Sequence, residues 1–469
     1  MTIQMRACVA VLLGALALSG CDLLDVKNPN NLVEESIREE VAAGSVVNGA
    51  QALVSEAVSE SWQPYLVASD ELYWIGSRDG WGQLDKGFVT NPTNEFIDGH
   101  FPGLGESRWM SDEAIEIVTE HLGNNPGSTS LQMNLARANV YSGIIYMVIG
   151  EIQEDFAFSD RREAFPPVGP ANMYQVLDAA IARFDAAVDG FTALGEPALV
   201  RDVRALRSRA HQSRAIWDVI NPVGTAALVS SAAAGADAAA VLAVVGNGAE
   251  WRYNLTYPSG APDNVMAGWI NDRKENQIDQ SLVTVDEDFA VTGVALEDPI
   301  DGIPDPALTR NIQQWKGASG ALGAVTDAGT VRPDLTLAST QLMHLILAEN
   351  ALAAAPAGNA AFEAQINYIR GMSMNTTGAT AVPMTPYTIG GAGMPSPIEM
   401  LQHTRKVNTF LQGLRLADMY RWDIQPSTAT GSVSTAVWEP ASEAASAPGT
   451  MLSLAIIEIR ANCFLNGSC

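Results

Sequence analysis

The chain has 469 residues, of which 17% are charged, and its formal net charge is −26. Phosphate-binding surfaces need clustered Lys and Arg, and the sequence holds no such cluster, so its composition argues against nucleic acid as a partner. The hydrophobic content of 47% is ordinary for a globular protein and is sufficient for a large core.

Residues 1–20 have the pattern of a lipoprotein signal peptide. Arg6 precedes an apolar run, residues 7–18, which is shorter than the roughly 20 residues that span a bilayer. Leu18-Ser19-Gly20-Cys21 is a lipobox, in which the Cys21 thiol receives a diacylglycerol. We therefore expect a mature chain that starts at Cys21 and is held on a membrane by acyl chains such as palmitate. An ordinary cleaved signal with a chance cysteine is the alternative.

The mature chain begins with a polar segment and continues into a helical part. Residues 21–32 hold three asparagines and Pro29, and we interpret them as a lipidated tether. Residues 33–60 are helical by pattern. Residues 61–110 mix many aromatic side chains with Gly, Asp and Asn, which predicts an irregular segment.

Helix is expected again over residues 111–220. Apolar residues at helical spacing line one face in each of three stretches that start near Leu131, Met173 and Arg201. Small residues at the contact points suggest antiparallel helix pairs similar to tetratricopeptide repeats. These pairs make residues 33–246 the N-terminal part of one large unit, residues 33–469.

The second half of the chain alternates between loop and helix. Residues 247–334 are rich in Gly, Pro, Asp and Asn and predict a loop-rich insert. The C-terminal part, residues 335–469, starts with helix to residue 371, broken at Pro356-Ala357-Gly358, and a loop follows to residue 395. Ser396-Pro397-Ile398-Glu399 is a strong helix start, and that helix should run to about Trp422. Loop and short strand are expected beyond it.

Cys463 and Cys469 close the chain. In an exported protein such a pair is expected to form a small disulfide loop. A metal site is the rival reading, but two thiols without nearby His or acidic residues are a poor ligand set.

Several stretches together resemble the SusD/RagB family of outer-membrane lipoproteins. They are the mature start Cys21-Asp22-Leu23-Leu24-Asp25-Val26 with Asn28-Pro29, residues 69–79, the Ala-Arg helix that begins Leu135-Ala136-Arg137-Ala138, and residues 410–422, Phe-Leu-Gln-Gly-Leu-Arg-Leu-Ala-Asp-Met-Tyr-Arg-Trp. The family usually has Glu where this chain has Gln412. The resemblance implies a mainly α fold, a SusD-like helical scaffold with tetratricopeptide-like helix pairs and long irregular ligand-binding segments.

The same resemblance implies a function. Such proteins sit in the outer membrane, bind oligosaccharides or sometimes peptides, and deliver them to a SusC-like TonB-dependent transporter. They are not enzymes and carry no cofactor.

Aromatic rings bind sugars by stacking on the apolar C–H face, and Trp offers the largest face. Six tryptophans in the irregular segments are therefore the candidates for glycan contact: Trp74, Trp81, Trp109, Trp251, Trp269 and Trp315. The alternative is that each ring fills the junction between a loop and the scaffold.

Four charged residues near the C-terminus look structural: Glu349, Arg415, Asp418 and Arg421. Glu349 falls on the apolar side of its helix, and a buried carboxylate needs a partner. We expect a Glu349–Arg415 or Glu349–Arg405 ion pair that clamps the two C-terminal helices.

No catalytic constellation stands out. The sequence has no Gly-x-Ser-x-Gly elbow and no His-Glu-x-x-His motif. The acidic loops at 286–288 and 297–302 lack the spacing of an EF-hand, so solvated loop is preferred to a metal site. A lipid-anchored glycoside hydrolase and a structural envelope lipoprotein remain as alternatives to a binding protein.

Overall fold

Long helices form most of the structure, a computed structural model that describes residues 37–160, 163–222, 226–258, 262–287, 291–315, 332–376, 380–422 and 450–469. The expected signal peptide, Cys21 and the tether 21–32 lie outside these residues. Among the described residues, no helix combines the length and the apolar character needed to cross a bilayer.

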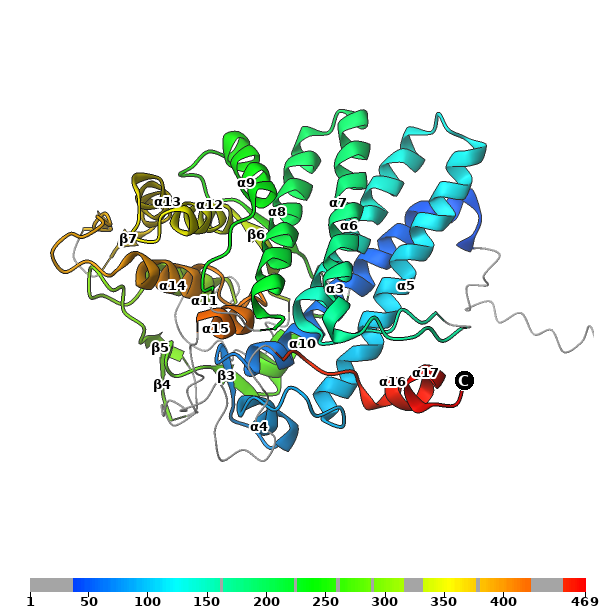
Figure 1. The fold of residues 1–469 in the computed structure, drawn as a ribbon, viewed down its shortest axis with the longest axis horizontal. Coiled ribbons are helices and arrows are strands. Elements are labelled where there is room, and N and C mark those ends of the chain that lie inside the picture. Colours follow the sequence, from blue (N-terminus) through cyan, green and yellow to red (C-terminus); the bar gives the residue numbers. More distant parts are fainter. Residues whose placement is uncertain are drawn as a thin grey trace, which may run out of the picture.

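Six long helices between residues 43 and 245 pack as successive neighbours (Figure 1). They are α3 (Ala43–Val67), α5 (Glu95–Asn124), α6 (Thr129–Ile152), α7 (Tyr174–Leu194), α8 (Pro197–Ile220) and α9 (Ala232–Val245). Only Gly195 and Glu196 separate α7 from α8, so these two helices run antiparallel. The expected mainly α class with helix pairs is confirmed.

The scaffold continues with helices from the second half. α12 (Thr340–Ala354) packs against α9, α13 (Ala360–Gly371) and α14 (Pro397–Asn408). The start of α14 follows the expectation, because Ser396 and Glu399 form a reciprocal capping box with Pro397 at the first helical position. The break between α12 and α13 also falls where the sequence places it.

Short elements tie the irregular segments to the scaffold. Each sheet of the described residues has two antiparallel strands. The pairs are β1 (Leu72–Trp74) with β3 (Asn276–Ile278), β2 (Arg252–Leu255) with β6 (Leu335–Ser339), β4 (Val283–Val285) with β5 (Val291–Val294), and β7 (Met374–Asn375) with β8 (Val382–Pro383). Short helical elements lie between them: α10 (Val265–Ala267), η4 (Gly268–Asp272) and α11 (Pro306–Gln314).

The helix boundaries near the N-terminus differ from the expectation. α3 follows the short η2 (Glu40–Ala42) and extends to Val67, beyond the predicted end at residue 60. The supposedly irregular segment 61–110 also contains α4 (Asp79–Asp85) and the first half of α5. Its glycines lower helix propensity, but α5 buries an apolar stripe that outweighs them. The first apolar residues of this buried stripe are Ile97, Phe101 and Leu104.

The predicted helix 397–422 is two helices in the structure. α14 ends at Asn408, and α15 (Arg415–Trp422) starts after a tight turn. Leu411 and Gly413 in that turn have left-handed backbone, with φ of 56° and 69°. The apolar periodicity runs through the turn, because the turn itself is buried, and so the pattern hides the break.

Residues 450–455 of the described tail are loop, as expected, but two helices follow where short strand was expected. α16 (Ile456–Ala461) and α17 (Cys463–Asn466) follow a single bridge between Gln153 and Leu452. A disulfide joins Cys463 to Cys469, with their Cα atoms 4.8 Å apart. Residues 423–449 lie outside the described residues.

Candidate functional site

Two of the six candidate tryptophans are core residues. Trp81 and Trp315 are 1% and 4% exposed. Trp81 lies against Phe96 with ring centroids 3.4 Å apart and nearly parallel planes. Since neither ring offers a face to a ligand, the expectation of glycan contact is wrong for these two, and they fill the junction between loop and scaffold.

Arginines cover two further rings. The guanidinium carbons of Arg273 and Arg78 lie 4.5 and 5.5 Å from the ring centroid of Trp269. Arg201 lies 5.1 Å from the ring centroid of Trp251 in the same way. A cation–π contact of this kind occupies a ring face that a sugar would need, and Trp269 has two such contacts while Trp251 has one.

Trp74 is half-buried and fits tightly against α4. A Cβ at Gly82 would come within 2.7 Å of the Trp74 ring, so the ring lies directly on the α4 backbone. Only the other side of this indole remains for contact with a ligand.

Among the candidate tryptophans, Trp109 lines an open cavity on the surface of α5. The cavity has a volume of about 350 Å³, and its other lining residues are Gly105, Glu106, Ser159 and Asp160. Ligand pockets commonly measure roughly 300–1,000 Å³. Glu106 lies three residues before Trp109 on α5, so its carboxylate and the indole share one face of the helix.

The loop that forms the other wall of this cavity is held in place from two sides. Arg108 donates a hydrogen bond to the carbonyl of Ser159 from the α5 side. From the C-terminal side, the Asn462 amide donates to the Phe165 carbonyl at 2.8 Å and to Ser159 Oγ at 3.2 Å. The C-terminal helices therefore support the Trp109 cavity.

Glu349 is fully buried, and its main partner is Arg421. Arg421 donates to both Glu349 oxygens, one through Nη2 at 3.2 Å, while Arg405 Nη1 lies 3.8 Å from Oε2. Among the ion pairs of the described residues, Glu349 has none with Arg415, so that half of the expectation is wrong. The turn before α15 redirects the helix and brings Arg421, not Arg415, to α12.

Asp418 completes this buried ion network. It accepts from Arg405 Nε at 2.8 Å and from Arg421 Nη2 at 2.7 Å. Burial acts to raise the pKa of Asp418, but the two guanidinium groups outweigh it and hold this pKa below its ordinary value. The network joins α12, α14 and α15, as a structural clamp requires.

Arg415 lies near a different carboxylate, that of Glu71. Glu71 is 2% exposed, and its Oε1 accepts from the Leu411 N–H at 2.8 Å. Burial raises the pKa of Glu71 to about 7, although the Leu411 N–H, Arg415 and Lys406 oppose the shift. This contact joins residues 69–79 to residues 410–422, two of the stretches that carry the family resemblance.

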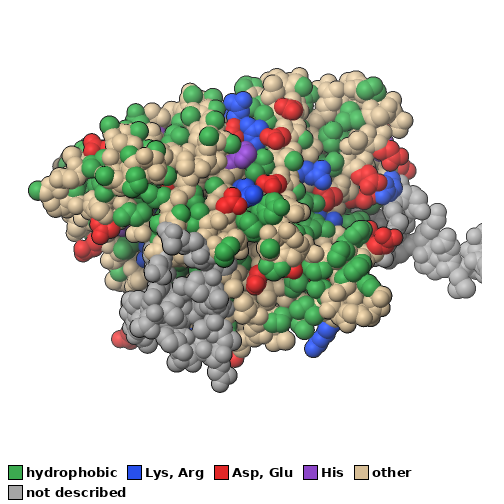
Figure 2. Space-filling model, viewed as in Figure 1, with side chains coloured by type: hydrophobic (Ala, Val, Ile, Leu, Met, Phe, Trp, Pro, Cys, Tyr) green, Lys and Arg blue, Asp and Glu red, His purple; other side chains and the backbone are tan. Residues whose placement is uncertain are grey.

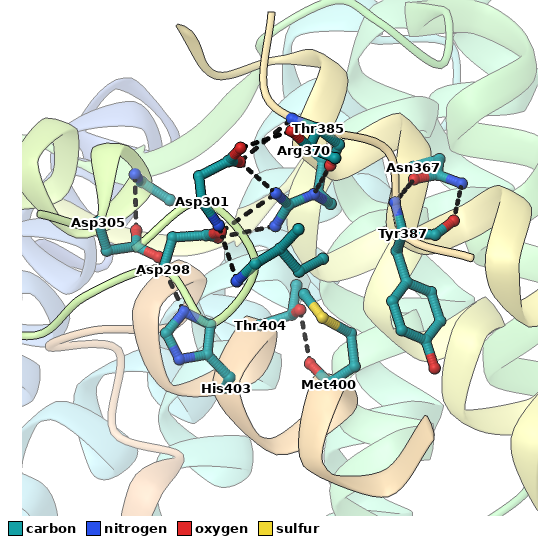
Figure 3. Close-up of polar contacts among 12 residues, drawn as sticks. Asp298, Asp301, Asp305, Asn367, Arg370, Thr385, Tyr387, Met400, His403 and Thr404 are labelled. Carbon is teal, nitrogen blue, oxygen red and sulfur yellow. Dashed lines mark hydrogen bonds and ion pairs between the residues drawn. The ribbon is translucent and has the colours of Figure 1, made fainter. Parts of the chain in front are cut away.

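In the acidic loop 297–302, Glu297 and Gly302 are exposed, as expected of a solvated loop, but Asp298 is buried and both Asp298 and Asp301 are paired, which corrects the expectation for these two residues. Asp298 is 4% exposed and accepts from Arg370 Nη1 at 2.7 Å (Figure 3). Asp301 accepts from Arg370 Nη2 at 2.8 Å and from Thr385 Oγ1 at 2.6 Å. Although burial acts in the opposite direction, Arg370 and the backbone N–H donors hold the pKa of Asp298 below its ordinary value.

The same region brings together Asp298, Asp305 and His403, whose ligand atoms lie within 4.8 Å of one another. Both carboxylates already have hydrogen-bond donors on each oxygen. Asp305 caps α11 by accepting from Ala307 N at 2.8 Å, and its other oxygen lies 2.8 Å from His403 Nε2. A cation would have to displace these contacts, so the group is explained as a structural anchor.

No protein-family model matches the sequence, and a comparison with curated protein sequences finds no match. Solved structures do match it. SusD superfamily proteins from Bacteroides fragilis and Bacteroides thetaiotaomicron each align with a TM-score of 0.56, at 14% and 12% identity. The alignments cover 91% and 90% of this chain and 98% and 97% of those chains. The chain has a SusD-like fold.

A SusD homolog from Bacteroides thetaiotaomicron gives a further match, with a TM-score of 0.51 at 12% identity. That alignment covers 85% of this chain and 90% of the homolog. At such identities the likeness shows the fold and leaves ligand contacts to be argued from this chain's own residues.

This SusD-like chain also contains a buried pair that sequence reasoning missed. Arg209 on α8 donates to both oxygens of Glu151 on α6, at 2.9 and 2.7 Å, and Arg209 is 1% exposed. It also reaches the carbonyl of Gln412 at 2.8 Å, which ties the α14–α15 turn to the scaffold. The signal that could have revealed this pair is the position of Arg209, a charged residue beside the apolar face of the helix predicted from Arg201 onward.

Proposed function

We propose that this protein is a lipid-anchored outer-membrane protein that binds oligosaccharides, or peptides, and passes them to a SusC-like TonB-dependent transporter. The observation that carries the proposal is the cavity beside Trp109, set in a SusD-like fold. Capture needs no chemistry on the ligand, and hydrogen bonds and ring stacking are sufficient for it.

The lining of the cavity suits a sugar. An indole provides a flat apolar face for the C–H groups of a pyranose ring. The carboxylates of Glu106 and Asp160 and the Ser159 hydroxyl are hydrogen-bond partners for sugar hydroxyl groups. Such a site combines one apolar platform with a few polar groups, as small-molecule sites generally do.

A glycoside hydrolase would need a carboxylic acid that stays protonated near neutral pH to donate to the leaving group. Glu60 and Glu71 are described carboxyl groups with a pKa raised to about 7. Neither lines the Trp109 cavity. This arrangement favours binding over hydrolysis at that cavity.

The lipobox at residues 18–21 supports the membrane anchor in this proposal. Acyl chains on Cys21 would concentrate the binding site at the membrane surface, beside the transporter that takes up the ligand. The net charge of −26 would make anionic lipid repel the protein body, so the anchor has to come from the acyl chains.

Affinity electrophoresis against a panel of polysaccharides tests the proposed function. We expect retarded migration in at least one gel, with no release of reducing sugar on incubation. Release of reducing sugar would instead support the hydrolase. A protein that no glycan or peptide retards would support the structural envelope lipoprotein.

A further inference from the structure

The helices α16 and α17 have no apolar core of their own. They have six and four residues, far fewer than the roughly 12–15 that an isolated helix needs for stability. Neither helix contains a buried residue, and both lie at the lower right of Figure 1, where Figure 2 shows hydrophobic side chains at the surface. Other contacts must therefore hold α16 and α17 in place.

Hydrogen bonds from the backbone fix the start of α16. The Ile456 N–H donates to the Pro92 carbonyl at 2.9 Å, and the Ile457 N–H donates to the Asp98 carboxylate at 2.9 Å. These contacts attach α16 to the first turn of α5 and to the residues before it. They do not involve α17, which needs a separate restraint.

Asn462 joins α17 to the wall of the Trp109 cavity. Its Oδ1 caps α17 by accepting from the Phe464 N–H at 3.0 Å. Its amide nitrogen makes the contacts with Ser159 and Phe165 described above, and it also donates to Glu458 Oε1 at 2.8 Å. Asn462 is 2% exposed. One buried side chain therefore starts the last helix and holds the loop that carries Ser159.

The cavity wall is fixed by contacts at the two described ends of this loop. Residues 161 and 162 lie outside the described residues. Ser159 Oγ accepts from the Phe165 N–H at 3.1 Å, so the two ends contact each other as well as Asn462. Ser159 lines the cavity, and its position therefore depends on where Asn462 lies.

The disulfide closes a loop immediately beyond Asn462. Cys463 is the first residue of α17, and its partner Cys469 is six residues further along the sequence. Inside this loop the Ser468 N–H donates to the Cys463 carbonyl at 3.0 Å. A helix of four residues without a buried side chain would fray if nothing restrained it, and the covalent loop supplies that restraint.

We propose that Asn462 is a positioning residue for the Trp109 cavity and that the closed disulfide keeps it in place, so that ligand affinity falls when the disulfide is reduced. The inference rests on the proposed function, because it concerns the same cavity. Asn462, Cys463 and Cys469 do not line the cavity, so they act through Ser159. A wall that is free to move must be ordered when the ligand binds, and this ordering costs affinity.

Reduction of the full-length lipoprotein tests the role of the disulfide. The other two cysteines of the sequence are Cys8 in the expected signal peptide and Cys21 at the expected lipidation site, so dithiothreitol acts on this pair. The probe is the polysaccharide of the panel that retards the oxidised wild type most strongly. We expect reduction to weaken binding by roughly fivefold to tenfold, the cost of ordering a few side chains. Cys463→Ser with Cys469→Ser should bind as weakly, and dithiothreitol should not weaken it further.

Asn462→Asp tests the positioning role. An aspartate keeps the oxygen that caps α17 but has no donor for the Phe165 carbonyl. The matched control is Asn359→Asp, because Asn359 caps α13 by accepting from the Phe362 N–H at 2.8 Å and donates to the Ala351 carbonyl at 3.0 Å, outside the cavity. We expect Asn462→Asp to weaken binding as much as reduction does, and Asn359→Asp to match the wild type.

Reduction of the Asn462→Asp variant separates positioning from a general loss of stability. If Asn462 and the disulfide act through one contact, reduction causes no further loss of affinity in this variant. Additive losses, or unchanged binding by the reduced wild type and by Asn462→Asp, would overturn the inference and leave the proposed function intact. An oxidised wild type that no polysaccharide or peptide retards would overturn both. Thermal melting checks that each protein is folded at the temperature of the gels.

Discussion

Trp109 is the single residue for which the structure makes the strongest case for ligand contact. Truncating a tryptophan at the centre of a binding site commonly costs more than about 1.4 kcal/mol, so Trp109→Ala should weaken glycan binding roughly tenfold or more. Retardation in polysaccharide gels measures the change.

Trp251→Ala is the matched control, because this half-buried ring is covered by Arg201 and lies outside the Trp109 cavity. Its retardation should remain close to that of the wild type. If Trp251→Ala weakened binding and Trp109→Ala did not, the binding site would lie near Trp251, in the loop-rich insert of residues 247–334.

Glu71 gives a prediction on pH. Its pKa is raised to about 7 in the folded protein, so folding favours the neutral form. The free energy of unfolding should therefore be highest below about pH 4.5, the ordinary pKa of a glutamate. It should fall as the pH rises toward 7, by at most roughly 3 kcal/mol, because the unfolded chain releases this proton more readily than the folded one. Glu71→Gln keeps an acceptor for Leu411 N–H and removes the titration. Relative to the wild type, the variant should gain stability between pH 5 and pH 8.

Urea denaturation at both pH values measures this difference. A constant difference between wild type and Glu71→Gln across the range would mean that Glu71 does not change its protonation state there. Comparing the two proteins cancels the contributions of the other titrating groups, including Glu60.

At the scale of elements, the α14–α15 turn depends on Gly413. Its φ is +69°, and a Cβ there would lie 2.7 Å from Trp62 Nε1. Gly195, which ends α7, has a similar φ of +75° but open space around it. Gly195→Ala should cost about 1 kcal/mol from backbone strain alone. Gly413→Ala should cost a further 1–3 kcal/mol, roughly, from overpacking.

Chemical denaturation of both glycine variants provides the comparison. Equal losses would show that Trp62 moves aside without cost. A larger loss for Gly413→Ala would confirm that the turn and the buried indole fit closely.

The clamp at Glu349 belongs to the same scale, because it joins α12 to α15. Removing one partner of a buried ion pair leaves the other charge uncompensated, so Glu349→Ala should destabilise the fold by roughly 3–5 kcal/mol. Asp218→Ala breaks the Arg214–Asp218 pair, in which the aspartate is 60% exposed, and should cost less than about 1 kcal/mol. Urea midpoints measure both, and similar losses would contradict the clamp.

Helix starts with local chemical signals could be predicted, whereas breaks inside buried stretches could not. Ser396, Pro397 and Glu399 specify the start of α14 through their own backbone contacts. The turn at Leu411 is specified by distant groups, the Glu71 carboxylate and Arg209, which no local pattern reveals. For the same reason the sequence indicated that Glu349 needs a buried partner but not which arginine supplies it.

The candidate site could be predicted only in part, because it too depends on contacts between distant parts of the chain. Tryptophans could be placed in irregular segments from composition, but their exposure depends on which side chains fold over them. Trp269 and Trp81 look alike in sequence context, and one is covered by arginines while the other stacks on Phe96. Trp109 lines a cavity together with Gly105, Glu106, Ser159 and Asp160, which no composition pattern indicates.

At the scale of the whole molecule, the long helices and the C-terminal helices together build the proposed ligand site. The Trp109 cavity lies between α5 and the loop that the C-terminal helices support.

The most direct test of this account is the mass of an oligosaccharide recovered after binding. The purified protein is equilibrated by dialysis with a defined oligosaccharide from a polysaccharide that retards it, and the bound sugar is then released and weighed by mass spectrometry. The account predicts saturable binding and a single recovered mass equal to that of the input sugar. Shorter fragments, or no bound sugar for any member of the panel, would contradict it.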